Sequence, residues 1–340
     1  MNIIFKKAFY NIAGFPLVHH LGRLWRGRAC VLCYHRVLPD DEFEADKSPN
    51  SDLVIPISRF SEQMKFLSEN HEVVSMDELV KQLEGGSKNF VVAITFDDGY
   101  RDNLIHALPI LKKYNIPTTI YITTRFPGGN TWMWWYEIWD YLEKKVFIEL
   151  NSDNKHYEWI IKTKKQRLSC FNELLMLIMK LSSQDQEVMV RNLTKNLYRK
   201  QYPELCLSWS EIKMLDQQPL VTIGAHTHTH TNLKQLMEKE VFLEISKSKT
   251  LLEEKLEHSV EHFAYPFGTA NEADTREYEI ATRCGFRTAV TTIPEMIQSP
   301  NLNAIPRLGV PSYLNIVGFR GKLSGGELLV RKIFTSMIFL

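Results

Sequence analysis

Short runs of β-branched and other hydrophobic residues recur along the chain, and segments with a helical pattern lie between them. The runs comprise residues 31–35, 73–75, 91–97, 118–123, 222–226, 262–266 and 288–292. Residues 103–114 place apolar side chains on one helical face and stop before Pro117, and residues 236–256 form a second amphipathic pattern. Strands that alternate with helices predict parallel pairing, so we expect an α/β, barrel-like fold.

The stretch from about 127 to 207 interrupts this alternation, because it contains no convincing strand. Its beginning holds a cluster of tryptophans at positions Trp132, Trp134, Trp135 and Trp139. Residues 171–181 and 187–198 have a helical composition. We therefore expect a helical insertion between two barrel strands. The tryptophan cluster favours a hydrophobic core, and a stacking surface for a pyranose ring is the alternative.

Both ends of the chain combine basic and apolar residues. The first 29 residues contain no acid, and their basic residues are Lys6, Lys7, Arg23, Arg26 and Arg28. Residues 328–340 repeat the pattern around Arg331 and Lys332. Neither end has an unbroken apolar stretch of the ~20 residues that span a bilayer, and the first lacks the hydrophobic region of a secretory signal. Two interpretations stay open: terminal helices packed on the domain, or segments lying on an anionic membrane face.

These patterns divide the chain into three predicted parts. They are a basic amphipathic segment at 1–29, a barrel at 30–320 that includes the insertion at about 127–207, and an apolar C-terminal helix at 321–340. We expect a cytoplasmic protein, with peripheral contact to the inner membrane face under the second interpretation of the chain ends.

Composition removes several classes of function. The 41 Lys+Arg and 40 Asp+Glu residues give a net charge of +1, which argues against a nucleic-acid partner and against a disordered acidic tail. The five cysteines show no regular spacing, and an odd number without a secretory leader fits a reducing compartment. Cys30 and Cys33 lie inside an apolar run, so we interpret them as strand residues and not as a redox pair.

Two adjacent acids, Asp97 and Asp98, follow the third hydrophobic run and precede Gly99. On a continuing strand their side chains would point to opposite faces, but Gly99 permits a turn that can aim both into one pocket. Carboxylates this close need a cation or hydrogen-bond donors to stay ionised together. The alternative is capping of a helix N-terminus, which explains one acid more easily than two.

Three histidines, His226, His228 and His230, fall within five residues. His226 and His230 are four residues apart, so in a helical or tightly turned segment they can bind one ion together. Two imidazoles and one carboxylate, with an open position for water, form a catalytic zinc arrangement. We expect His228 to face away or to contact the ligands from outside. A single histidine would favour a hydrogen-bonded core residue, whereas this cluster and the Asp pair together favour a metal site.

At these residues the sequence resembles the polysaccharide deacetylases that share the NodB homology domain, carbohydrate esterase family 4. The resemblance covers roughly residues 30–125 and 205–310. The matching segments are Thr95-Phe96-Asp97-Asp98-Gly99, His226-Thr227-x-x-His230, Phe263-Ala264-Tyr265-Pro266-Phe267-Gly268, Leu207-Ser208-Trp209-Ser210 and Val31-Leu32-Cys33-Tyr34-His35. The fold that the resemblance implies is a distorted barrel of about seven βα units, a (β/α)7 barrel.

The resemblance also implies roles for individual residues. Asp98, His226 and His230 would hold a divalent metal, usually zinc, and Asp97 would be the general base that deprotonates water. The tetrahedral oxyanion would be stabilised by the metal and by a backbone N–H near Phe267. We expect Phe267, Tyr265 and Tyr100 to contribute to substrate binding.

The chain departs from the family pattern in three places. Ala264 stands where the commoner third motif has an arginine, the fourth motif is replaced by Cys284-Gly285-Phe286-Arg287, and Ile305-Pro306-Arg307-Leu308 replaces the motif that supplies the general acid. We expect Arg307 to substitute for the missing arginine by pairing with Asp97 and keeping it ionised. His35, after the first strand, is our candidate for the general acid, and a hydrogen-bonded residue at the barrel rim is the alternative.

The reaction that these residues imply is hydrolysis of a carbon–nitrogen, non-peptide amide bond. We expect a metal-dependent N-deacetylase that acts on an N-acetylated sugar of a glycan or lipid-linked saccharide, in the biosynthesis of a cell-envelope polysaccharide. Two alternatives stay open: an O-acetyl esterase that acts on a carbohydrate, and a glycan-binding relative with weak or no turnover. A glycosidase with paired carboxylates would leave the His226 and His230 pair unexplained.

Overall fold

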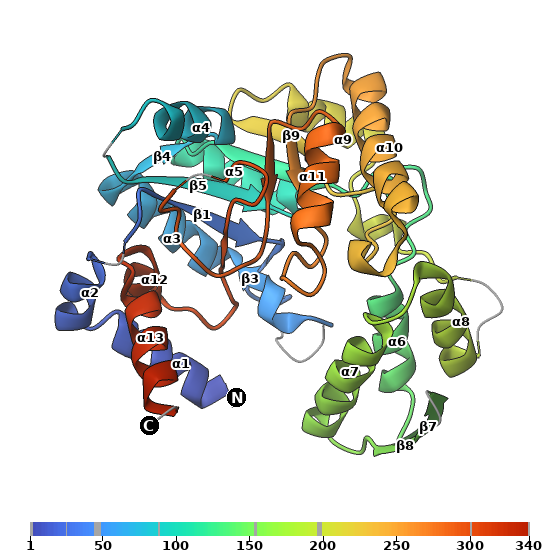
Figure 1. The fold of residues 1–340 in the computed structure, drawn as a ribbon. Coiled ribbons are helices and arrows are strands. Elements are labelled where there is room, and N and C mark those ends of the chain that lie inside the picture. Colours follow the sequence, from blue (N-terminus) through green and yellow to red (C-terminus); the bar gives the residue numbers. More distant parts are fainter. Residues whose placement is uncertain are drawn as a thin grey trace.

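The computed structural model describes residues 3–24, 26–43, 49–87, 89–152, 155–195, 199–299 and 301–338. Its centre is an eight-stranded sheet in which the neighbouring strands run parallel. The strand order is β11 (Thr288–Val290), β10 (His262–Ala264), β9 (Val221–Ala225), β6 (Thr118–Ile122), β5 (Val91–Phe96), β1 (Ala29–Tyr34) and β12 (Leu308–Gly309), and β4 (Glu72–Val74) also pairs with β5. The sheet curls into a distorted barrel with helices around it, as predicted (Figure 1).

All seven predicted strands are present, and each begins and ends within two residues of its predicted limits. Every residue of β1 and β5 is buried, which explains why these strands are continuous hydrophobic runs. Strand β12 was not predicted, because a strand of two residues leaves no periodic pattern. A further pair of parallel strands, β2 (Arg36–Leu38) and β3 (Val54–Pro56), follows β1 at the barrel rim.

The helices of the barrel begin at sequence signals that satisfy their free backbone N–H groups. Ser208 and Glu211 form a capping box at α9, as do Asp274 and Glu277 at α11, and Ser75 caps α4. These helices are α3 (Ile57–Asn70), α4 (Met76–Glu84), α5 (Leu108–Lys113), α9 (Trp209–Asp216), α10 (Glu238–Leu256) and α11 (Thr275–Arg283). The predicted helix at 236–256 is confirmed as α10, and the one at 103–114 is a π-helical turn (Asn103–Ala107) followed by α5.

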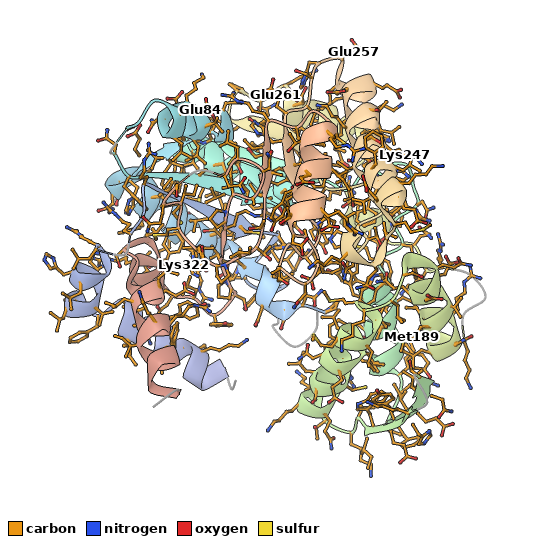
Figure 2. All side chains as sticks on the ribbon, viewed as in Figure 1. Glu84, Met189, Lys247, Glu257, Glu261 and Lys322 are labelled. Atoms are coloured by element: carbon orange, nitrogen blue, oxygen red, sulfur yellow. The ribbon has the colours of Figure 1, made fainter. Side chains whose placement is uncertain are left out.

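The insertion lies between β6 and β9, as predicted, and has its own hydrophobic core. It contains α6 (Trp134–Glu143), β7 (Phe147–Ser152), β8 (Lys155–Ile160), α7 (Lys164–Ile178) and α8 (Ser183–Thr194). Its helices agree with the predicted helical insertion, but the expectation that this stretch contains no strand is wrong, because β7 and β8 pair as an antiparallel hairpin. The predicted helix at 187–198 ends at Thr194 as part of α8, and residues 196–198 lie outside the described part of the chain. Figure 2 labels Met189 of α8, which belongs to this insertion.

The two ends of the chain lie side by side (Figure 1). Helices α1 (Ile3–Ala13) and α2 (Pro16–Gly22) pack against α12 (Ile316–Leu323) and α13 (Gly326–Ile338), and we call these four the terminal helices. The approach is close, because a Cβ on Gly321 would lie 2.4 Å from the backbone of Ala13. Buried Glu327 accepts a hydrogen bond from the Tyr10 hydroxyl and pairs with Lys322, which Figure 2 labels beside these helices.

Helix α12 also packs against α3, so the terminal helices contact the barrel, as the first of the two interpretations states. The expected C-terminal helix at 321–340 is divided between α12 and α13, which Gly325 separates with a φ of 83°. Residues 339 and 340, at the end of the predicted segment, fall outside the described residues. No helix in the described ranges combines the length and the hydropathy that crossing a bilayer requires.

Candidate active site

The site begins where β5 ends, at Asp97 and Asp98. Asp98 has a φ of 73° and Gly99 a φ of 75°, so the chain turns sharply directly after the strand. A Cβ on Gly99 would lie 3.0 Å from the Ile122 side chain, which explains why glycine occupies this turn. Both carboxylates are almost fully buried at the carboxyl end of the sheet, and neither caps a helix among the described elements. The turn predicted at Gly99 is confirmed.

His226 and His230 lie in a tight turn that follows β9. Thr227 and His230 both have positive φ values, 59° and 58°, which fold this segment without any helix. The Thr227 hydroxyl accepts a hydrogen bond from the His230 backbone N–H. Glu244 of α10 holds the outer side of the turn, because its carboxylate accepts hydrogen bonds from the backbone N–H groups of His228 and Thr229.

Asp98, His226 and His230 converge on one point. The Asp98 Oδ1 atom lies 3.4 Å from His226 Nε2 and 3.1 Å from His230 Nε2. One ligand atom from each of the three residues lies within 4.8 Å of the others. The His226 Nδ1 atom contacts the Ala264 carbonyl oxygen at 2.7 Å, which fixes the ring and leaves Nε2 directed at Asp98. Asp98 Oδ1 and His230 Nδ1 are buried without a hydrogen-bond partner in the described part of the chain.

These features fit a divalent metal ion. A buried carboxylate oxygen and two imidazole nitrogens are ligands that zinc prefers, and three protein ligands leave one position open for water. An ion at this point would also offset the free-energy cost of burying a carboxylate oxygen that has no hydrogen bond. The same three residues were the predicted ligands, and the structure brings all three together.

Asp97 forms a bidentate ion pair with Arg307, which directly precedes β12. Arg307 Nη1 lies 2.7 Å from Asp97 Oδ1, and Nη2 lies 2.6 Å from Oδ2. Arg307 is fully buried, and it also donates hydrogen bonds to the Thr291 carbonyl and the Thr95 hydroxyl. Burial by itself would raise the pKa of Asp97, but the Arg307 charge and His226 outweigh it and lower the pKa to about 2. The predicted pairing of Arg307 with Asp97 is therefore present.

His35 lies beside Asp97, directly after β1. Ligand atoms of Cys33, His35 and Asp97 lie within 4.8 Å of one another. Burial lowers the pKa of His35, and the charges of Asp98 and Asp97 oppose this effect. No described residue forms a hydrogen bond with the His35 ring, so the structure gives no support to a hydrogen-bonded rim residue. Cys33 and Cys30 are free, buried thiols of β1, as predicted.

The three residues expected to bind substrate have different positions. The Phe267 ring packs on His230, with 4.9 Å between ring centroids, and its backbone N–H has no hydrogen-bond partner in the described ranges. The Tyr265 side chain is fully buried, and its hydroxyl donates a hydrogen bond to the Asn303 carbonyl. Tyr100 is buried in the core of the insertion. Of these three, Phe267 has a ring contact with a metal ligand, and Tyr100 lies close enough to Asp98 for that charge to add to burial in raising its pKa. Any contact of Tyr265 with substrate would involve its backbone.

A cleft of about 520 Å³ lies between the insertion and the barrel, next to His230. Trp132, Trp134 and Trp135 line its insertion side, and Arg125 lines the barrel side. The Trp135 ring lies 5.2 Å from the His230 ring, centroid to centroid. The tryptophan cluster is thus core, as the pattern favoured, and three of its members also line the cleft, where the alternative of a sugar-stacking surface would put them. His228 contacts Thr124 and stays outside the ligand group, as expected.

Comparisons with known proteins point to one family. The family model described as "Polysaccharide deacetylase" matches residues 84–289, more than half of the chain. A Bacillus subtilis (strain 168) protein named as a polysaccharide deacetylase, YxkH, is 33% identical over 101 residues, which is 29% of this chain and 33% of that protein. The chain thus matches only a third of the length of this relative.

Solved structures share the fold at low sequence identity. The deacetylase PplD of Streptococcus pyogenes, solved with acetate, superimposes with a TM-score of 0.56 at 19% identity, over 89% of this chain and 97% of that one. IcaB from Ammonifex degensii gives 0.54 at 20% identity, over 87% and 97%. A de-N-acetylase from Aggregatibacter actinomycetemcomitans gives 0.56 at 15% identity, over 87% and 99%.

Proposed function

This chain belongs to the polysaccharide deacetylase family, and on that premise we propose that it is a metal-dependent hydrolase that removes N-acetyl groups from amino sugars of a glycan or lipid-linked saccharide. The observation that supports the proposal is the convergence of Asp98, His226 and His230 beside the ion pair of Asp97 and Arg307. A glycan-binding protein without turnover would need neither the second buried carboxylate nor the arginine that keeps it charged.

We propose Asp98, His226 and His230 as the ligands of a divalent metal, with zinc as the best fit to two nitrogens and one oxygen. When bound, such an ion supplies a Lewis acid that makes water more acidic and polarises a carbonyl group. The protein contributes a rigid site, because the Ala264 carbonyl orients His226 and the Thr227 hydroxyl holds the backbone at His230.

Asp97 is the proposed general base. Its carboxylate stays ionised at neutral pH, because Arg307 lowers its pKa to about 2, and an ionised carboxylate can accept the proton of the attacking water. The two hydrogen bonds from Arg307 also fix the plane of this carboxylate. The backbone N–H of Phe267 is the proposed donor to the oxyanion, since it makes no other hydrogen bond within the described residues.

His35 is the proposed general acid, which would protonate the departing amine of the sugar. Two observations support the proposal: ligand atoms of His35 and Asp97 lie within 4.8 Å of each other, and no described residue forms a hydrogen bond with the His35 ring. The products would be acetate and a free amino sugar.

The proposed substrate enters through the cleft beside His230. Of its three tryptophans Trp132 is only half-buried, and its indole ring is suited to an N-acetylated sugar, because a pyranose presents an apolar face that stacks on such a ring. A lipid-linked substrate would also bring the protein to the membrane surface. The terminal helices offer apolar side chains for that contact, since Leu17 and Leu21 are exposed on one face of α2 and Leu24, just beyond that helix, is exposed as well.

Mass spectrometry of a panel of substrates tests the proposal. Oligosaccharides and glycolipids that carry N-acetylhexosamine or O-acetyl groups are incubated with the wild type, with Asp97→Asn and with Asp41→Asn, a matched change at an exposed acid. We expect loss of one acetyl mass from an N-acetylated substrate with the wild type and Asp41→Asn only. Loss from O-acetylated sugars alone would assign the esterase activity, and release of acetate by none of the three proteins would reject the proposal.

A further inference from the structure

A second cleft, of about 430 Å³, lies between the terminal helices and the barrel. Arg23 and Arg26 after α2 and Arg320 of α12 line one side, and Phe66, His71 and Phe90 line the other. His71 and Phe90 directly precede β4 and β5, whereas Asp97 and Asp98 follow β5. The cleft is therefore at the opposite end of the barrel from the metal ligands, separated by the roughly 20 Å length of a six-residue strand.

The three arginines of this cleft have no carboxylate partner among the residues that the structure describes. Arg26 lies over the Phe90 ring at 4.1 Å, and Arg320 lies over the Phe66 ring at 5.6 Å. Stacking on aromatic rings orients a guanidinium group but leaves its N–H donors free. The carboxylate that lines the cleft, Glu72, accepts a hydrogen bond from the Gln82 amide.

The positive charges of the cleft act on one another. Burial lowers the pKa of His71 to about 4, and Arg26, His19 and Arg23 contribute to the decrease. Burial also lowers the pKa of Arg26, and the neighbouring Arg23 adds to that effect. Like charges gathered in a concave site repel one another, and an anion bound between them relieves the repulsion.

We propose that this cleft binds the phosphate group of a small anionic ligand, either a soluble phosphate ester or a phospholipid headgroup. Guanidinium groups donate paired hydrogen bonds that match the oxygens of a phosphate. The volume is in the range of small-molecule sites, and Arg23, Arg26 and Arg320 gather in one concavity, which suits a compact anion and not a nucleic-acid backbone. This inference is independent of the deacetylase proposal, because it uses other residues at the other end of the barrel.

Calorimetric titration with inorganic phosphate and pyrophosphate tests the site. The double variant Arg23→Gln/Arg320→Gln removes two cations that make no side-chain hydrogen bond with the described residues, so we expect it to fold normally. Arg283→Gln/Lys239→Gln removes two exposed positive charges on α11 and α10 and is the matched control. We expect pyrophosphate affinity to fall by at least about tenfold in the first variant and to change less than about twofold in the control.

Nuclear magnetic resonance of the His71 ring provides a second readout. A bound phosphate would offset the arginine charges, so the pKa of His71 should rise from about 4 on addition of pyrophosphate, in the wild type and not in Arg23→Gln/Arg320→Gln.

Sedimentation with vesicles distinguishes the two sources of phosphate. Vesicles of phosphatidylcholine alone are compared with vesicles that contain about one third phosphatidic acid. Binding of the acidic vesicles that Arg23→Gln/Arg320→Gln abolishes would assign a lipid headgroup, and pyrophosphate binding without vesicle binding would assign a soluble ester. Either result supports the site. If the wild type binds neither probe saturably, or if both double variants lose binding equally, the proposal is overturned.

Discussion

The ion pair between Asp97 and Arg307 should couple these two residues strongly. Both are almost fully buried, so neither charge is screened by water as at the surface. The lowering of the Asp97 pKa to about 2, from 3.8, corresponds to roughly 2 kcal/mol in favour of the ionised form. Arg307→Gln would leave a buried carboxylate without its counter-charge, and we expect it to lower the free energy of unfolding by about 3–5 kcal/mol.

A double-mutant cycle measures this coupling. Urea unfolding at neutral pH is followed for the wild type, Asp97→Asn, Arg307→Gln and the double variant. We expect the double variant to be more stable than the sum of the single effects predicts, by about 2 kcal/mol or more. Arg283 and Glu238 form an exposed ion pair at 2.6 Å, and the equivalent cycle on this pair should give about 1 kcal/mol or less.

Equal coupling energies in the two cycles would refute the reasoning. An Arg307→Gln protein that unfolds at the same urea concentration as the wild type would also refute it. A buried carboxylate without a counter-charge must lower the free energy of unfolding. Arg307→Lys keeps the charge but loses the two parallel hydrogen bonds, so its stability should lie between those of the wild type and Arg307→Gln.

Three further variants test individual parts of the account. His35→Ala should lower kcat by about 100-fold and remove the alkaline limb of the pH–rate profile, and an unchanged limb would exclude His35 as the general acid. Trp132→Ala should raise KM by about fivefold with little change in kcat, as steady-state kinetics can measure, because Trp132 lines the cleft and has no ring contact with a metal ligand among the described residues; a fall in kcat alone would contradict this role. Leu17→Ser/Leu21→Ser should weaken flotation with anionic liposomes at low salt, and a wild type that binds no such liposomes would reject the membrane contact.

The sequence predicted the barrel because its strands are buried on both faces and therefore appear as hydrophobic runs. The hairpin of β7 and β8 escaped prediction for the opposite reason: its residues are mostly exposed and polar, and Ile148 and Trp159 are its two buried side chains. Its stability depends on the core of the insertion, against which these two residues pack. Tertiary contacts therefore decide its structure more than local pattern does.

The candidate ligands were predictable, because they follow strands that are neighbours or near neighbours in the sheet and their carboxyl ends meet at one edge. The ion pair of Arg307 was predictable from the missing arginine at position 264. The approach of Trp135 to His230 was not, because it depends on how the insertion docks on the barrel. Glu244 was also missed, since its contact with the histidine turn depends on the position of α10 and leaves no local motif.

Metal content tests the central proposal most directly. Elemental analysis of the purified full chain should find about one divalent transition-metal ion per molecule. His226→Gln and His230→Gln should each reduce this content strongly and abolish acetate release, whereas His228→Gln, a matched change outside the ligand group, should keep both. A wild-type protein that contains no such ion, binds none when zinc, cobalt or manganese is added, and releases acetate at the same rate in a chelator would contradict the account.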